Sequence, residues 1–218
     1  MQTKNLFRRA ISRFARDFIY TRMDHEAAYD IMERTAAALD SLGVRWWLMD
    51  GTLLGFVREG EFLGHDADVD IGIHMSDYSP ALLSALRDTG LQLYSQHGTP
   101  DNGLEITVRS RWLYLPGTSL DIFLFYDDEG QDTWWHATSY KGHQMRYRYP
   151  RFELETLEVR GQTYNVPSPP ERFLVQKYGD DWRTPNTSWH GLLSPKSLQI
   201  DHLAPEVQAR IRAAQGKQ

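Results

Sequence analysis

Alternating acidic and apolar residues around position 70 constrain this chain more than any other feature. They close the segment 46–73, WWLMDGTLLGFVREGEFLGHDADVDIGI. The acidic positions are Asp66, Asp68 and Asp70, and the apolar positions are Val69, Ile71 and Ile73. Side chains two residues apart in a strand point to the same face, so the pattern predicts a strand with one acidic and one buried face. Crowded carboxylates repel one another unless they are protonated, spread apart or bound to cations. Because oxygen-rich clusters suit Mg²⁺ or Mn²⁺, the strand predicts a site for one of these metals.

A glycine-containing turn lies before the acidic strand. Gly51-Thr52-Leu53-Leu54-Gly55 follows an apolar strand predicted over 44–49 and begins a short helix that runs through Arg58. Backbone N–H groups at such a helix start, from Gly51 onward, bind phosphate oxygens together with the Thr52 hydroxyl, and Arg58 is a donor of matching charge. Gly and Thr also occur at helix starts for local reasons, so the turn is informative only beside the acidic strand.

A further acidic residue, Asp121, lies near the start of an apolar strand predicted over 119–126. A carboxylate in so hydrophobic a strand needs a partner. Asp121 either lies at the exposed start of the strand, where charge is tolerated, or joins Asp68 and Asp70 as a third metal ligand or a general base.

The segment 127–150 is polar and rich in aromatic residues. One interpretation is a recognition wall, in which aromatic residues bind a sugar or a quaternary ammonium group and arginines on one strand face bind an anion. Its residues would be Trp134, Trp135, His136, Arg146 and Arg148. The alternative is core or edge packing, the commoner use of aromatic side chains.

Helices and further strands are predicted around these motifs. A helix over 24–42 should turn its apolar stripe inward and stop at Gly43. The stripe consists of Ala27, Ile31, Thr35, Ala38 and Leu42. Other predicted elements are a helix from Pro80 to Gly90, antiparallel strands over 104–108 and 112–115, a hairpin over 155–166, and helices over 168–178 and 205–215. We expect one compact domain, with N-terminal helices over 1–43 and a core with a C-terminal extension over 44–218.

Composition excludes several classes of protein. The 218 residues are 41% hydrophobic and 12% aromatic, as in folded globular proteins. The net charge of −5 argues against nucleic-acid binding, which needs a basic surface. The chain has no cysteine, which excludes disulfides and zinc-thiolate sites. With no secretory signal pattern and no run of about 18 apolar residues, we expect a cytoplasmic protein.

The N-terminal segment differs from the rest of the chain in charge. Residues 1–23 contain six basic residues and one acidic residue, Asp17. Helical spacing over 4–21 places apolar residues on one stripe. The stripe either packs on the domain or contacts an anionic leaflet, which would place the protein peripherally at the inner face of a membrane.

Five motifs occur in a linked order between about Val44 and Pro185. They are the 51–55 turn, Arg58, the block His65-Asp66-Ala67-Asp68-Val69-Asp70-Ile71, Asp121-Ile122-Phe123, and Tyr178-Gly179-Asp180-Asp181-Trp182. The set resembles the LicD family, which includes bacterial phosphocholine transferases and fukutin-type proteins. The resemblance implies a nucleotidyltransferase-like α+β fold, a mixed β-sheet with flanking helices.

The resemblance also implies a divalent metal held by two aspartates of one strand and a third aspartate of a later strand. Asp68 and Asp70 match the pair, Asp121 matches the third, and Asp66 matches an auxiliary acidic position. Leu63-Gly64-His65 departs from the Ile-Pro-Trp-like approach of many members. His65 is then either a substrate contact or a hydrogen-bonding partner behind the ligands.

The activity implied is transfer of a phospho-alcohol unit, phosphocholine or a polyol phosphate, from a CDP-linked donor such as CDP-choline or CDP-ribitol. The acceptor would be a hydroxyl of a cell-surface glycan or its lipid-linked precursor, and CMP would be released. The alternatives are nucleotidyl transfer from an NTP to a small molecule and a non-enzymatic glycan-binding or scaffold protein with a structural cation site. A metal phosphohydrolase of the HD type needs further histidine ligands at helical positions, which this sequence does not offer.

Overall fold

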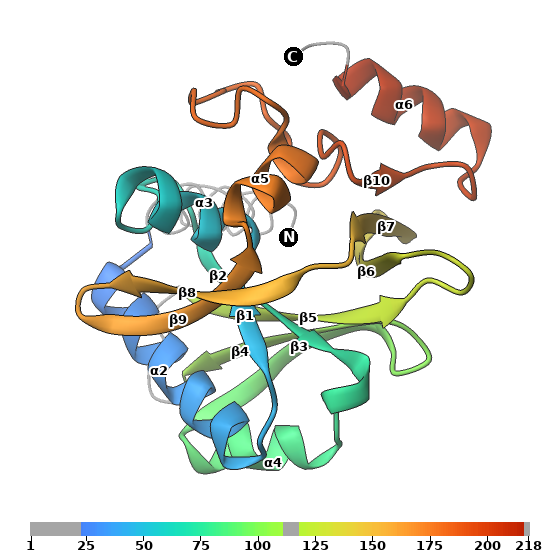
Figure 1. Ribbon diagram of the computed structural model, residues 1–218. Coiled ribbons are helices and arrows are strands. Elements are labelled where there is room, and N and C mark those ends of the chain that lie inside the picture. The colour runs from blue at the N-terminus through green and yellow to red at the C-terminus, as the bar shows by residue number, and fades with distance from the viewer. Residues whose placement is uncertain (1–22, 111–117, 216–218) are drawn as a thin grey trace, which may run out of the picture.

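A branched mixed β-sheet forms the centre of the protein (Figure 1). The computed structural model describes residues 23–110 and 118–215. Within these residues eight strands form the sheet: β1 (Trp46–Leu48), β2 (Asp68–His74), β3 (Leu91–Thr99), β4 (Asn102–Ser110), β5 (Ser119–Asp127), β6 (Thr133–Tyr140), β7 (His143–Pro150) and β10 (Leu198–Gln199). The helix predicted over 4–21 and the strand predicted over 112–115 lie outside the described residues.

Strand β5 is the branch point of the sheet. It pairs in parallel with β2, which places Asp121 opposite Asp70. On its other side β5 pairs with β4 through residues 120–123 and with β6 through Tyr126 and Asp127. The sheet therefore divides into a β4–β3 arm and a β6–β7–β10 arm, and β2 and β5 lie side by side at its centre.

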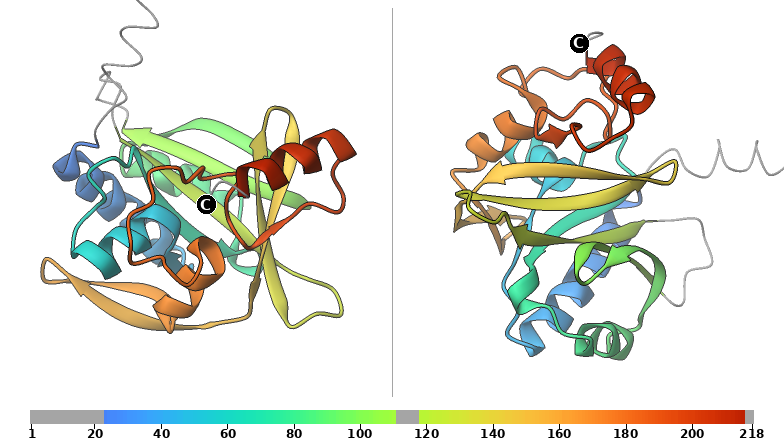
Figure 2. Two further views of the ribbon diagram at one scale, coloured as in Figure 1. Left: turned by 90° about the horizontal axis from the view of Figure 1, so that it is seen from above. Right: turned by 90° about the vertical axis from the view of Figure 1, so that its right-hand side faces the viewer.

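Helices cover both faces of the sheet (Figures 1 and 2). Helices α2 (His25–Ser41) and α4 (Ala81–Asp88) lie on one face, which is called here the apolar face. Helices α3 (Asp50–Glu59) and α5 (Pro170–Tyr178) lie on the opposite, polar face, with α6 (Pro205–Gln215) beyond them. A short 3₁₀ helix, η1 (Met75–Asp77), follows β2, and the hairpin β8 (Glu153–Val159)–β9 (Gln162–Ser168) packs beside β1. This mixed sheet with flanking helices confirms the predicted α+β fold.

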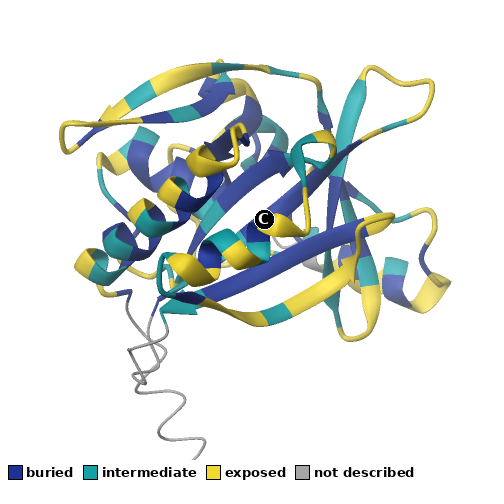
Figure 3. Cartoon of the chain, turned by 90° about the horizontal axis from the view of Figure 1, so that it is seen from below, coloured by how far each residue is buried: buried dark blue, intermediate teal, exposed yellow. Residues whose placement is uncertain are grey.

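Alternation along the central strands makes the two faces different. Val69, Ile71 and Ile73 of β2 are 0% exposed, as are Leu120, Ile122 and Leu124 of β5. The intervening positions point to the polar face. Figure 3 shows the result: buried residues run along the strands, while the helices carry one buried stripe and one exposed side.

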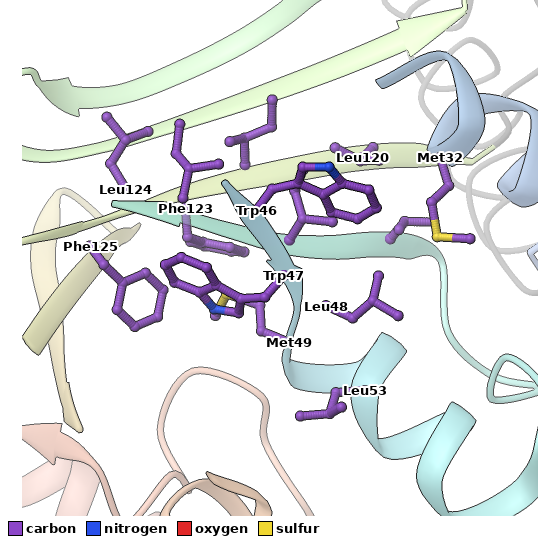
Figure 4. Close-up of a cluster of buried hydrophobic side chains, with 14 of the residues drawn as sticks. Met32, Trp46, Trp47, Leu48, Met49, Leu53, Leu120, Phe123, Leu124 and Phe125 are labelled. Carbon is purple, nitrogen blue, oxygen red and sulfur yellow. The ribbon is translucent and has the colours of Figure 1, made fainter. Parts of the chain in front are cut away.

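An aromatic cluster closes the end of the polar face where β1 and β6 lie. Trp47 packs edge-on against Phe125 at 5.1 Å between ring centroids (Figure 4). It also stacks on Trp134 at 6.2 Å. Its indole lies over Gly72, where an added Cβ would come within 2.4 Å of the ring nitrogen. Glycine is required there because Trp47 occupies the space that a side chain would fill.

Two predictions about the elements need correction. Ile31, Thr35 and Ala38 of the predicted inward stripe of α2 are buried, but the stripe is partly rotated: Ala28 and Leu39 are 0% exposed, whereas Ala27 is half-buried and Leu42 is 39% exposed at the C-terminal cap. Strand β4 pairs with β3 and β5 on its two sides, so residues 104–108 do not have the hairpin partner that the sequence indicated. In the described residues, no helix is long and apolar enough to cross a membrane.

The rotation of α2 can be tested with two leucines three residues apart. Leu39→Ala should lower the free energy of unfolding by about 2–5 kcal/mol, because it opens a cavity under the sheet. Leu42→Ala should change it by less than about 1 kcal/mol, because this side chain is largely in solvent. Urea unfolding followed by tryptophan fluorescence measures both. Equal losses for the two variants would contradict the orientation of the helix.

Candidate active site

Three carboxylates gather at the start of β2 on the polar face. One oxygen each from Asp66, Asp68 and Asp70 lies within 4.8 Å of the other two. Asp68 and Asp70 share a face because they are two residues apart in the strand, whereas Asp66 joins them from the turn just before β2. We call these three residues the acidic cluster.

The turn into α3 fixes the acidic cluster from behind. The peptide N–H of Gly51 donates to Asp70 Oδ2 at 3.1 Å, and the N–H of Asp70 donates to Thr52 Oγ1 at 2.9 Å. A Cβ at position 51 would lie 2.2 Å from Asp66 Oδ2. The Gly-Thr pair of the sequence therefore lets the carboxylates approach the helix start, and it ties β2 to α3.

Asp121 extends the carboxylates onto the next strand. It lies opposite Asp70 in the β2–β5 register and receives a hydrogen bond from the Thr107 hydroxyl of β4. Asp121 Oδ1 and Asp66 Oδ2 are buried and have no hydrogen-bond partner among the described residues. Two acidic oxygens are thus left without a donor at the same end of the polar face.

Burial and mutual repulsion change the titration of these groups. Burial is the main cause that raises the pKa of Asp66 to about 7, and the charge of Asp68 adds to it. The pKa of Asp121 is also raised to about 7, by burial and then by Asp68. Burial, followed by the neighbouring aspartates, raises the pKa of Asp70 well above its usual range. Charged together, these groups oppose folding unless a cation neutralises them.

A buried ion pair lies beside the acidic cluster. Lys177 of α5 is 5% exposed and pairs with Asp50, the first residue of α3. Asp50 has a φ of 47°, in the left-handed region that a side chain disfavours. Its charge contributes to the raised pKa of Asp66, Asp68 and Asp70. Lys177 supplies the compensating positive charge and connects α5 to the helix start that contacts the cluster.

Strand β4 adds a second row of polar side chains that the sequence-based prediction missed. Glu105 and Thr107 are 6% and 8% exposed, and they point to the polar face with Arg109. They alternate with Leu104, Ile106 and Val108, which are all 0% exposed. The alternation in LEITVR was a usable signal of a strand with one polar face. Asp50 and Lys177, in contrast, are 127 positions apart, and no local pattern connects them.

Three predicted site residues either bond to other parts of the protein or lie in solvent. The Arg58 guanidinium donates to the Trp182 carbonyl at 3.3 Å and pairs with Glu59, so it joins α3 to the loop after α5. Thr52 is 0% exposed, and its hydroxyl accepts from Asp70 N–H, so here it joins α3 to β2, and its contact with phosphate stays a prediction. His65 is exposed in the turn before β2.

The predicted recognition wall is divided between the two faces of the sheet, because neighbouring strand residues face opposite ways. Trp135, Arg146 and Arg148 share one face, while Trp134 and His136 lie on the other. Trp134 stacks on Trp47 at the polar face, whereas Trp135 stacks on Tyr126 at 4.6 Å on the other face. Arg146 lies over the Trp135 ring at 4.4 Å. Arg148 is the register partner of Trp135 and pairs with Asp128 at 2.6 Å. Both arginines therefore lie on the face of the sheet opposite to Asp121.

The donor set fits a hard divalent cation. Asp66, Asp68, Asp70 and Asp121 offer carboxylate oxygens only, the ligands that Mg²⁺ and Mn²⁺ prefer. Two of these oxygens are buried without a donor among the described residues, as a ligand set requires. The three carboxylates whose oxygens lie within 4.8 Å of one another include Asp66 and not Asp121. Asp66, which was predicted to be auxiliary, therefore lies as close to Asp68 and Asp70 as a metal ligand would.

Comparison with known proteins shows the family of this chain. Residues 43–169 match the family model described as LicD/FKTN/FKRP, nucleotidyltransferase domain. The chain belongs to the LicD/FKTN/FKRP family. The resemblance inferred from the five motifs is thereby confirmed. The matched residues include α3, the acidic cluster, Asp121 and β4, and they end before α5 and Lys177.

Curated relatives within the LicD/FKTN/FKRP family include human ribitol-5-phosphate transferase FKTN, 30% identical over 83% of this chain and 38% of that protein. Human ribitol 5-phosphate transferase FKRP is 27% identical over 65% of this chain and 29% of that protein. The chain thus spans well under half the length of these relatives. The crystal structure of the lincomycin-bound lincosamide antibiotic adenylyltransferase LnuA has a TM-score of 0.47 and 16% identity, over 73% of this chain and 89% of that one.

The raised pKa values predict a stability that falls as pH rises when metal is absent. Asp121 has a folded pKa of about 7 against an ordinary value of 3.8, so between these values the folded state binds more protons than the unfolded state. Metal-free protein should therefore lose stability from pH 5 to pH 8, and Asp121→Asn should remove part of that loss. Thermal unfolding in EDTA measures it, with exposed Asp88→Asn as control.

Magnesium should reverse this loss, because the carboxylates must release protons before they bind a metal. The rise in melting temperature on addition of Mg²⁺ should be larger at pH 8 than at pH 6. An equal rise at both pH values would show that the cluster does not bind the ion.

Proposed function

We propose that this protein is a metal-dependent transferase that moves a phospho-alcohol unit from a CDP-linked donor to a hydroxyl of a glycan or glycolipid, with release of CMP. Two findings support the proposal. The chain belongs to a family whose curated members FKTN and FKRP are named ribitol 5-phosphate transferases. Its polar face also carries an acidic cluster of the kind that binds the cation of a phosphate-transfer enzyme.

The acidic cluster is the observation that carries the proposal. Asp68 and Asp70 would hold Mg²⁺ or Mn²⁺, with Asp121 and Asp66 at either side of the pair. When bound, such an ion neutralises diphosphate oxygens and the charge that develops on the leaving CMP. These carboxylates are held before any ligand arrives, since Gly51 and Thr52 fix Asp70 by two hydrogen bonds.

The remaining residues at the site position this cluster. The Asp50–Lys177 ion pair joins α5 to the first turn of α3, whose next residue, Gly51, contacts both Asp66 and Asp70. Lys177 is buried, so its charge is shielded little by solvent and acts on Asp50, its ion-pair partner. The site therefore combines a surplus of negative charge with the buried cation Lys177, and Arg109 partly offsets the rise that burial causes in the pKa of Asp121.

The proposal predicts the effect of neutralising the two central aspartates. Asp68→Asn and Asp70→Asn should each lower kcat for CMP release by about 100-fold or more, because each removes a ligand charge that holds the cation, and the cation stabilises the transition state. Both should also weaken Mn²⁺ binding, while the melting temperature without metal stays equal or rises. The exposed Asp88→Asn should leave all three quantities unchanged.

The donor assay separates the proposal from its alternative. CDP-ribitol, CDP-glycerol and CDP-choline are supplied with Mg²⁺ and simple methyl glycosides, and CMP is quantified. Release of CMP that depends on Asp68 and Asp70 supports phospho-alcohol transfer. Release of pyrophosphate from an NTP, with no CMP from any CDP-alcohol, would overturn it in favour of nucleotidyl transfer.

A further inference from the structure

Glu105 of β4 is a buried acid on the polar face that does not belong to the acidic cluster. It lies opposite Phe123 in the β4–β5 register, and Thr107 lies opposite Asp121. Glu105 and Asp121 are therefore diagonal neighbours, and such positions lie about 7–8 Å apart. The side chain is 6% exposed. Glu105 thus stands one strand beyond the carboxylates that suit the metal.

The surroundings of Glu105 are unusual for a buried carboxylate. Its hydrogen-bond donor is neutral: the Thr138 hydroxyl of β6 donates to Oε2 at 2.6 Å. Among the described residues, none of the ion pairs includes Glu105, although a buried acid is normally paired with a cation. Burial raises its pKa to about 7, the Thr138 hydrogen bond opposes the rise, and the charge of Asp68 adds to it.

Other titratable and charged groups face Glu105 from each neighbouring strand. They are His97, its register partner on β3, Asp121 on β5, Tyr147 on β7 and Arg109 on β4 itself. Asp68 of β2 is a further charged group, and the neutral Thr138 hydroxyl faces Glu105 from β6. Two of these groups are acids of the proposed metal site, so Glu105 is close enough to feel its charge without contributing a ligand to the cluster.

We propose that Glu105 is the catalytic residue that accepts the proton of the acceptor hydroxyl, with Thr138 as its positioning residue. The inference rests on the proposed function and deepens it. A base must lie beside the metal ligands, within reach of the hydroxyl that attacks the phosphorus, and must not be committed to the ion. Glu105 is a diagonal neighbour of Asp121 and is not part of the acidic cluster, whereas Asp121 lies directly opposite Asp70.

The step balances as a substitution at phosphorus. The acceptor O–H bond breaks and its proton passes to the Glu105 carboxylate, while the acceptor oxygen forms a bond to the phosphorus that carries the alcohol. The bond from that phosphorus to the CMP oxygen breaks, and CMP leaves with the electron pair. Glu105 returns the proton to solvent after the products depart.

Glu105→Gln tests the inference with little change in shape, because the amide oxygen still accepts the Thr138 hydrogen bond. We expect kcat for CMP release from CDP-ribitol to fall by about 100-fold or more, the usual contribution of a general base. The Mn²⁺ affinity should match the wild type, and the melting temperature should be equal or higher because a buried acid with a raised pKa is neutralised. Glu105→Asp, which keeps a carboxylate, should recover part of kcat. The exposed Glu129→Gln is the matched control.

Thr138→Val gives a readout that a merely structural role would not move. Loss of the hydroxyl removes the hydrogen bond that lowers the pKa of Glu105, so the acidic limb of the kcat–pH profile should shift to higher pH. An unshifted limb, or a Glu105→Gln variant within a few-fold of wild-type kcat, would overturn the inference alone. Absence of CMP release from the wild-type protein with every CDP-alcohol and acceptor would overturn the inference and the proposed function together.

Discussion

Repulsion among buried carboxylates is the constraint on which this site depends. Asp66, Asp68 and Asp70 lie within 4.8 Å of one another, and each has a raised pKa because of burial and the other charges. A protein that keeps such a group folded must supply positive charge, and here Lys177 supplies part of it through Asp50. The negative charge that Lys177 does not balance favours the binding of a divalent cation at the polar face.

The free energy that holds these acids together comes from the other side of the same strands. Asp70 and Asp121 each lie between aliphatic residues of β2 or β5 that are 0% exposed, and Asp68 directly precedes one, so these acids have neighbours packed on the apolar face beneath α2. Fully burying a Val, Leu or Ile side chain contributes roughly 1.5–3 kcal/mol. The alternation of polar and apolar residues thus specifies both the acidic site and the apolar packing behind it, because a one-residue shift in strand register would exchange the two faces.

The parts of the site that could be predicted from the sequence are those that depend on residues close together in the chain. The alternation from Asp66 to Ile73 predicts the acidic cluster, and the Gly-Thr turn predicts the helix that supports it. The pattern LEITVR predicts Glu105 by the same reasoning, but only a strand over 104–108 was predicted there, without its polar face. The Asp50–Lys177 pair joins residues 127 positions apart, and only the packing of α5 on α3 brings them together. Trp134 and Trp135 were misjudged because adjacent strand residues cannot share a face.

The acidic residues on the polar face have different neighbours, and these neighbours determine which chemical role suits each residue. The cluster residues lie together, so the charges of Asp68 and Asp50 add to burial in raising the pKa of Asp66 and Asp70, and all gain from one shared cation. Glu105 faces the Thr138 hydroxyl, and burial is the first cause of its raised pKa, with the Asp68 charge a smaller one. A cation bound at Asp68 would offset only that smaller contribution, so Glu105 would keep most of its affinity for a proton. Metal binding and proton acceptance can therefore occur together on one face of one sheet.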